Sequence, residues 1–340
     1  MFRKGQIVRL FLKGRGAPLL AAIGLTLAAT AAPAQSTYPD RPVTFISDAP
    51  PGLSSDVATR IVAEQLSTIW KQQVVVLNQP GGGGSISARA ASRAAPDGYT
   101  FYTPSNSTFL QLKGAAGVAP NLPIEMPRDF LPVGFISVQP MLIGVSPKLN
   151  VSSVAELVAL AKQKPGEIAF AATGRGRFTH LTMELFQIRA GVKLTFVPYT
   201  GGPAAAMNDV TSGRVGIIVD GYPGIGGAIE GDLIKGLGVG SSERLKEFPN
   251  LPAIAETLPG FFASGWTILI APVGTPDEIL KKVSADLNKA LESPDLLARF
   301  SKLGLYTNKT ALADAGEFVK KEQETWRPVL EKVASEDTNK

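Results

Sequence analysis

The chain has 340 residues, of which 34 are Lys or Arg, 29 are Asp or Glu, one is His and none is Cys. The lack of cysteine excludes disulfides and thiol chemistry, and a single histidine, His180, argues against a zinc site, so we expect no metal and no cofactor. The five excess positive charges lie among the first 15 residues, so the chain from Gln35 onward is neutral and does not indicate nucleic-acid binding.

Residues 1–34 have the layout of a secretory signal peptide. A basic segment precedes a short apolar run from Ala17 to Ala31, and Ala32-Pro33-Ala34 is a small-residue cleavage site. The apolar run is shorter than the ~20 residues of a membrane span. We therefore predict export of the chain, with cleavage near Ala34.

The rest of the sequence alternates strand-type and helix-type segments, which is typical of α/β architecture. We expect strands at 43–46, 73–77, 99–103, 131–146, 168–172, 194–198, 215–219, 233–239 and 266–271. Helices are expected from 54–56 to about 69, at 85–95, 151–164, about 179–189 and 203–212, and from 276 to about 335.

Three helix starts carry sequence signals. Ser54, Ser55 or Asp56 is expected to cap the first helix after the turn Pro50-Pro51-Gly52, in which glycine permits a positive φ. Ser153 with Glu156 forms a capping box. Thr275 with Glu278 forms another, with Pro276 at the first helical position.

Turns rich in small and hydroxyl residues follow five of the expected strands, at 50–56, 80–85, 105–108, 173–179 and 200–204. Each is by itself an ordinary βα connection. In a doubly wound sheet, however, such turns gather at the carboxyl ends of the strands, where ligands bind. Four of them also open helices, whose N-termini attract anions. The repetition predicts a site for a small carboxylate.

Signals for catalysis are weak. The glycines at 81–84 lack the lysine of a P-loop and the third glycine of a dinucleotide fingerprint. No G-x-S-x-G nucleophile elbow occurs. An exported α/β hydrolase would have to use His180, which lies at an expected helix start. We therefore expect no enzyme, with the hydrolase kept as an alternative.

The sequence resembles the periplasmic solute-binding proteins of tripartite tricarboxylate transporters, the Bug family, over essentially the whole chain after the leader. The residues that carry the resemblance are Tyr38-Pro39-Asp40-Arg41-Pro42, Pro50-Pro51-Gly52 with Asp56, Asn78 with Pro80-Gly81-Gly82-Gly83-Gly84, Ala95-Pro96-Asp97-Gly98-Tyr99-Thr100, Arg128-Asp129-Phe130, His180-Leu181, Val197-Pro198-Tyr199 with Gly201-Gly202, Trp266, and Ala271-Pro272 with Gly274-Thr275-Pro276.

The resemblance implies a two-lobed, type II periplasmic binding protein fold, with a mostly parallel sheet and flanking helices in each lobe and a ligand cleft between the lobes. We expect lobe 1 at 35–137 plus 253–340 and lobe 2 at 138–252. It also implies capture of a small organic acid and delivery to membrane permease subunits, without catalysis, by what we expect to be a monomer. A binding protein that feeds a sensor kinase is a further alternative.

By the same resemblance, both lobes contribute loop residues to the ligand site. The expected residues are Pro51, Gly52, Leu53, Ser54, Ser55, Gly84, Ser85, Ser105, Asn106 and Ser107 from lobe 1, and Thr173, Arg175, Arg177, Phe178, Thr179, Thr200, Gly201, Gly202, Asp220 and Tyr222 from lobe 2.

Two departures from the family pattern bear on the ligand. Leu53 replaces a second glycine, which should narrow the entrance or alter the approach of the backbone. Arg175 and Arg177 stand where small residues are usual. We hypothesise that one arginine pairs with a second carboxylate, which favours a dicarboxylate or an aromatic acid; both could equally face solvent. Asp220 could bind a ligand hydroxyl or amino group or simply close a turn. Aromatic candidates for the wall, or for ordinary core packing, are Tyr102, Phe109, Phe178, Tyr222 and Trp266.

Overall fold

The computed structural model describes residues 38–111, 122–308 and 311–338, which belong to one compact unit, Tyr38–Lys340. The predicted signal peptide lies outside these residues. No helix in the described ranges is long and apolar enough to cross a membrane.

The strands lie close to their predicted positions. They are β1 (Val43–Ser47), β2 (Val74–Asn78), β3 (Thr100–Thr103), β4 (Phe130–Val145), β5 (Ala169–Ala172), β6 (Thr195–Pro198), β7 (Ile217–Gly221), β8 (Lys235–Val239) and β9 (Ser264–Pro272).

Helices follow most of the strands. They are α1 (Ser54–Trp70), α2 (Ser85–Ser92), α3 (Asn106–Phe109), α4 (Val154–Gln163), α5 (Phe178–Ala190), α6 (Pro203–Thr211), α7 (Tyr222–Glu230), α8 (Asp277–Leu291), α9 (Pro294–Lys302) and α10 (Ala315–Thr338), with short 3₁₀ turns at Gly82–Gly84, Pro147–Leu149, Ile254–Glu256 and Leu312–Asp314.

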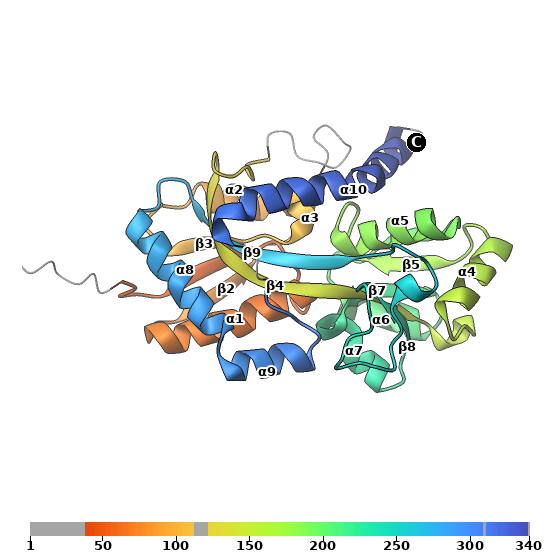
Figure 1. Cartoon of the computed structure of the whole chain (residues 1–340). Coiled ribbons are helices and arrows are strands. Elements are labelled where there is room, and N and C mark those ends of the chain that lie inside the picture. The colour runs from red at the N-terminus through yellow and green to blue at the C-terminus, as the bar shows by residue number, and fades with distance from the viewer. Residues whose placement is uncertain (1–37, 112–121, 309–310, 339–340) are drawn as a thin grey trace, which may run out of the picture. The chain divides into compact units, whose positions relative to one another are not determined.

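The strands form one mixed sheet in the order β2-β1-β3-β9-β4-β7-β5-β6, with β8 paired to β4. The strands β1, β2 and β3 are parallel to one another, as are β5, β6 and β7. The strands β4 and β9 run antiparallel between these two groups (Figure 1). The α/β prediction is therefore confirmed, with antiparallel strands added at the middle of the sheet.

The long strand β4 changes partners along its length. It pairs with β9 from Phe130 to Pro140 and with β7 and β8 from Met141 to Val145. One strand thus takes part in both halves of the sheet. The expected lobe boundaries near this point stay a prediction.

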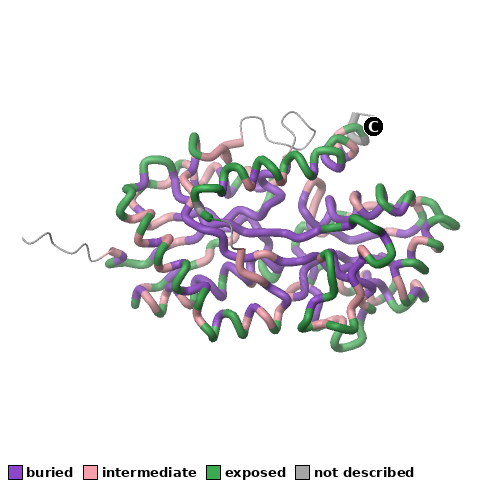
Figure 2. The backbone as a smooth tube through the Cα atoms, viewed as in Figure 1, coloured by how far each residue is buried: buried purple, intermediate pink, exposed green. Residues whose placement is uncertain are grey.

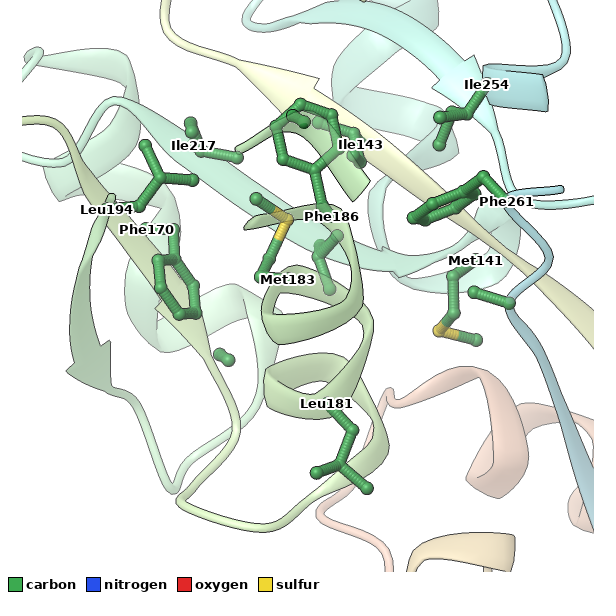
Figure 3. Packing of buried hydrophobic residues seen from close by; sticks show 14 of the residues in the cluster. Met141, Ile143, Phe170, Leu181, Met183, Phe186, Leu194, Ile217, Ile254 and Phe261 are labelled. Atoms are coloured by element: carbon green, nitrogen blue, oxygen red, sulfur yellow. The ribbon is translucent and has the colours of Figure 1, made fainter. Parts of the chain in front are cut away.

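Most residues of the sheet are buried, and the surrounding helices carry the exposed residues, as the colours of the backbone in Figure 2 show. One apolar cluster lies around α5, where Met183 and Phe186 pack among Ile143 of β4 and Ile217 of β7 (Figure 3). A second cluster lies between β1, α1 and α8 and includes Phe45. Truncating a fully buried phenylalanine such as Phe186 to alanine typically costs about 3–5 kcal/mol.

Two of the predicted helix starts are wrong and one is confirmed. Leu53, without a side-chain cap, precedes α1, so none of the predicted residues caps it. Pro276 lies at the N-cap of α8 rather than inside it. The Thr275 hydroxyl donates to the carbonyl of Pro272 and does not cap the helix. Ser153 does cap α4, because its Oγ accepts the N–H of Glu156 at 3.2 Å.

The C-terminal helix α10 contacts elements of both halves of the sheet. The side chain of Gln323 donates to the carbonyl of Phe109 in α3, and the indole of Trp266 in β9 donates to Glu322. Further along α10, Trp326 packs edge-on against Phe178 of α5 with 4.8 Å between ring centroids. The helix therefore ties α3 and β9 to the start of α5.

Candidate ligand-binding site

A small cavity lies where the ends of β1, β3, β5 and β7 meet β4 and the start of β9. Its volume is about 20 Å³, in a measure in which one water molecule needs about 10–15 Å³. The lining residues are Leu53, Ser54, Ser55, Ser105, Asn106, Ser107, Gln139, Met141, Thr173, Arg177, Phe178, Thr179, Asp220 and Gly265.

The turn before α1 is hydrogen-bonded to the side chain of Asp56. Its Oδ2 accepts the N–H of Gly52 at 2.9 Å and its Oδ1 accepts the Asn78 amide at 2.7 Å. Gly52 has φ +80°, a conformation that suits glycine. Asp56 thus fixes the turn rather than capping the helix.

The N-termini of two long helices face the cavity. Ser54 and Ser55 begin α1, Phe178 and Thr179 begin α5, and all four residues line the cavity. Neither helix has a side-chain cap bond at its start. First-turn N–H groups have no acceptor within their own helix and carry the positive end of the dipole. The two helix starts therefore favour a negative group.

A buried ion pair crosses the edge of the cavity. The Nη2 of Arg177 lies 3.4 Å from Oδ1 of Asp48 and donates to Oγ of Ser105 at 2.9 Å. The Asp48 carboxylate also accepts the N–H of Ser105 at 3.1 Å and the hydroxyl of Thr108. The Asp48 side chain is fully buried and that of Arg177 is 10% exposed. The contact between Arg177 and Asp48 therefore connects the turn after β5 with the turn after β1.

A second buried contact joins α1 to the end of β7. The hydroxyl of Ser54 donates to Oδ1 of Asp220 at 2.9 Å, and the N–H of Gly221 donates to the same atom at 2.7 Å. Burial raises the pKa of Asp220 to about 7, although both hydrogen bonds act to lower it. The Oδ2 atom of Asp220 accepts no hydrogen bond.

Two further polar atoms of cavity-lining residues lack a partner. They are Oγ of Ser55 and Nδ2 of Asn106, and both residues are at least nine-tenths buried. Buried polar groups without a partner are uncommon in proteins. Together with Oδ2 of Asp220, they are two donors and one acceptor without a partner on residues that line the same cavity.

Residues 58–334 match the family model described as "Tripartite tricarboxylate transporter family receptor". The chain belongs to this family. The receptor is 35% identical to protein BugT of Bordetella pertussis, over 92% of this chain and 96% of BugT. It is 33% identical to a protein from the tcbD-tcbE intergenic region of Pseudomonas sp. strain P51, over 91% of each chain.

Solved structures confirm the periplasmic binding protein fold of the receptor. A Rhodopseudomonas palustris protein solved with adipate is 30% identical, with a TM-score of 0.80, over 88% of this chain and 98% of its own. The periplasmic binding protein BugD is 28% identical, with a TM-score of 0.78, over 87% and 98%. MatC of R. palustris, solved with bound malate, is 26% identical, with a TM-score of 0.77, over 86% and 100%.

The receptor is a solute-binding protein of the periplasmic type and not an enzyme, so the hydrolase alternative is overturned. His180 is fully buried against the rings of Phe170 and Phe196, and its Nδ1 accepts the N–H of Gly176 at 3.3 Å. Desolvation, with Arg175 and Lys332 nearby, lowers the pKa of His180 to about 3. No group of three His, Cys, Asp or Glu residues that could hold a metal occurs among the described residues.

The structure brings together the predicted residues of the turns after β1, β3, β5 and β7. Those that do not line the cavity are Pro51, Gly52, Gly84, Ser85, Arg175, Thr200, Gly201, Gly202 and Tyr222. Arg175 donates to the carbonyl of Val333 in α10 at 2.9 Å. Tyr222 stacks on Phe248 and donates to Glu230 at 2.6 Å. A role of the cavity-lining residues in ligand binding stays a prediction.

The predicted aromatic wall is mostly core. Tyr102, Phe109 and Trp266 belong to one buried apolar cluster, whereas Phe178 lines the cavity. Sequence reasoning missed Gln139, Met141 and Gly265, which lie on the two central strands, and also Asp48. Asp48 had a signal, because it is a charged residue directly after a buried strand.

Proposed function

We propose that this receptor captures a small carboxylate in the cavity between the turns after β1, β3, β5 and β7. The observation that carries the proposal is the convergence of two long-helix N-termini with the unpartnered donors of Ser55 and Asn106. These groups suit a carboxylate and require no metal. The relatives solved with adipate and malate support the same ligand chemistry.

Ligand entry requires the cavity to widen, because about 20 Å³ holds little more than one water molecule. We propose that lobe 1 (35–137 and 253–340) and lobe 2 (138–252) separate by bending of β4 and β9. The bonds between Ser54 and Asp220 and between Arg177 and Ser105 then break, and they form again around the ligand. A ligand drives this closure by the difference in its affinity for the two states.

The closed, loaded receptor would deliver its ligand to the permease subunits of a tripartite tricarboxylate transporter, as the family description supports. We propose that the chain reaches the periplasm through cleavage of its leader near Ala34. N-terminal sequencing of the exported protein tests the cleavage site, and loss of ligand uptake on deletion of the receptor gene tests delivery. The receptor should elute as a monomer in size-exclusion chromatography.

A thermal-shift screen of the full chain, expressed with its leader and purified from the periplasm, tests carboxylate capture. The panel should contain mono-, di- and tricarboxylates, aromatic acids and amino acids, beginning with adipate and malate. A ligand at 100 times its dissociation constant adds about 2.7 kcal/mol to the free energy of unfolding. No response to any carboxylate, confirmed by calorimetry, would refute the proposal.

A further inference from the structure

In the closed arrangement of the structure, the cation at the cavity is already paired within the chain. Among the described residues that line it, the charged side chains are Arg177 and Asp220. The guanidinium of Arg177 already faces the carboxylate of Asp48, which is fully buried. A second carboxylate that approached Arg177 would have to share it with Asp48, and two carboxylates at one buried cation repel each other.

Asp48 makes the contacts that a bound carboxylate would make. It accepts the main-chain N–H of Ser105, the hydroxyls of Ser105 and Thr108, and a bond from Nη1 of Arg177 at 3.4 Å. Such a set of charge-assisted bonds is the usual way a protein holds an anion. The chain thus fills one anion subsite with its own side chain.

The remaining cavity groups fit one carboxylate and one donor. Oγ of Ser55 and Nδ2 of Asn106 can donate to a carboxylate at the start of α1. Oδ2 of Asp220 has no partner and can accept a hydrogen bond, and it lies beside Gly224 in the first turn of α7. Because all three residues line the same cavity, a carboxylate and a donor that reach them together must lie close to each other in the ligand.

We propose that the receptor selects a monocarboxylate with a hydroxyl or amino group on the neighbouring carbon, and that Asp48 excludes dicarboxylates by occupying Arg177. This inference rests on the proposed function and narrows its ligand class. In it, Asp220 accepts the bond from the hydroxyl or amino group. Asp48 acts through Arg177, as an internal competitor for the second carboxylate.

Titration calorimetry of the full exported chain with matched ligands tests the proposal. The shortest set contains propionate as the plain monocarboxylate, lactate and alanine as the hydroxy and amino monocarboxylates, and succinate and malate as the dicarboxylates. Longer homologues repeat the same comparison. In the wild type, the hydroxy or amino monocarboxylate of a set should bind at least about tenfold tighter than both the plain acid and the dicarboxylate.

The variant Asp48→Asn keeps the shape of the side chain and removes its charge. It should free Arg177 and tighten dicarboxylate binding at least about tenfold, while the preference for the hydroxyl or amino group remains. Asp232→Asn removes an exposed carboxylate in the turn after α7 and serves as the matched control, with unchanged affinities. Circular dichroism and a thermal melt establish that both variants are folded.

The outcomes separate this inference from the proposed function. If no carboxylate binds either the wild type or Asp48→Asn, the proposed function fails. If carboxylates bind but a dicarboxylate is preferred by the wild type, the function stands and the inference is overturned. Should Asp48→Asn not fold, the wild-type comparison alone decides, because the preferred ligand class is a property of the native chain.

Discussion

Replacement of Asp220 by asparagine should change how the stability of the receptor depends on pH. Burial raises the pKa of Asp220 from 3.8 to about 7 in the folded chain. Between these values the folded state keeps a proton that the unfolded state has released, so the free energy of unfolding falls as pH rises. Below about pH 3.8 Asp220 is protonated in both the folded and the unfolded state. Above about pH 7 it is charged in both, and the cost of burying this charge lowers the free energy of unfolding in full.

The size of this effect follows from the two pKa values. At about 1.4 kcal/mol per pH unit, the rise from 3.8 to about 7 corresponds to about 4 kcal/mol of lost stability at alkaline pH. About 2 kcal/mol of this is already lost at pH 5. Asparagine stays neutral at both pH values, so Asp220→Asn should gain about 2–3 kcal/mol on the wild type between pH 5 and pH 8.

Urea unfolding followed by circular dichroism at pH 5, 6, 7 and 8 measures the difference. The asparagine oxygen can still accept the bond from Ser54. Any other contact that the substitution removes should change the free energy of unfolding by a similar amount at every pH. Asp232→Asn is the control for the loss of one exposed carboxylate. A stability difference between wild type and Asp220→Asn that is the same at pH 5 and pH 8 would refute the reasoning.

Three further variants test the surroundings of the site. A Cβ at Gly224 would lie 2.0 Å from Oδ2 of Asp220, so Gly224→Ala should lower the melting temperature by several degrees, whereas Gly227→Ala, with nothing within 4 Å, should not. His180→Gln should weaken the loss of stability on acidification from pH 6.5 to 4. In this range the unfolded chain binds a proton at His180, whereas buried His180 in the folded chain, with its pKa lowered to about 3, does not. A ratio of the urea midpoints at pH 7 and pH 5 that is the same in His180→Gln and in the wild type would contradict this. Arg175→Ala should destabilise the chain by about 1 kcal/mol, since its bond to α10 is lost, yet leave the ligand dissociation constant within about threefold in calorimetry.

The five turns rich in small and hydroxyl residues could be predicted from the sequence. Which of them line the cavity could not. The turns after β1, β3, β5 and β7 line the cavity, whereas those after β2 and β6, at 80–85 and 200–204, do not. The reason is strand order, since β2 and β6 form the two ends of the sheet. Strand order arises from pairing between distant segments, which the spacing of turn residues along the chain does not encode.

The two arginines of the turn after β5 illustrate the same limit. Arg175 and Arg177 are two residues apart in one glycine-rich turn, yet one binds the main chain of α10 and the other faces Asp48. Their directions depend on partners 158 and 129 residues away in the sequence. Asp48 itself was within reach of sequence reasoning, but its pairing with Arg177 depends on the tertiary fold.

The placement of β9 has a consequence for the order in which the receptor folds. This strand, Ser264–Pro272, fills the position between β3 and β4, which come from the first half of the chain. Until β9 pairs with β3 and β4, each of these two strands has an edge of unpaired backbone N–H and C=O groups. Such edges promote aggregation. A chain that stops before Ser264 should therefore be caught as an aggregating fragment, and the intact receptor should fold slowly because this pairing closes a long loop.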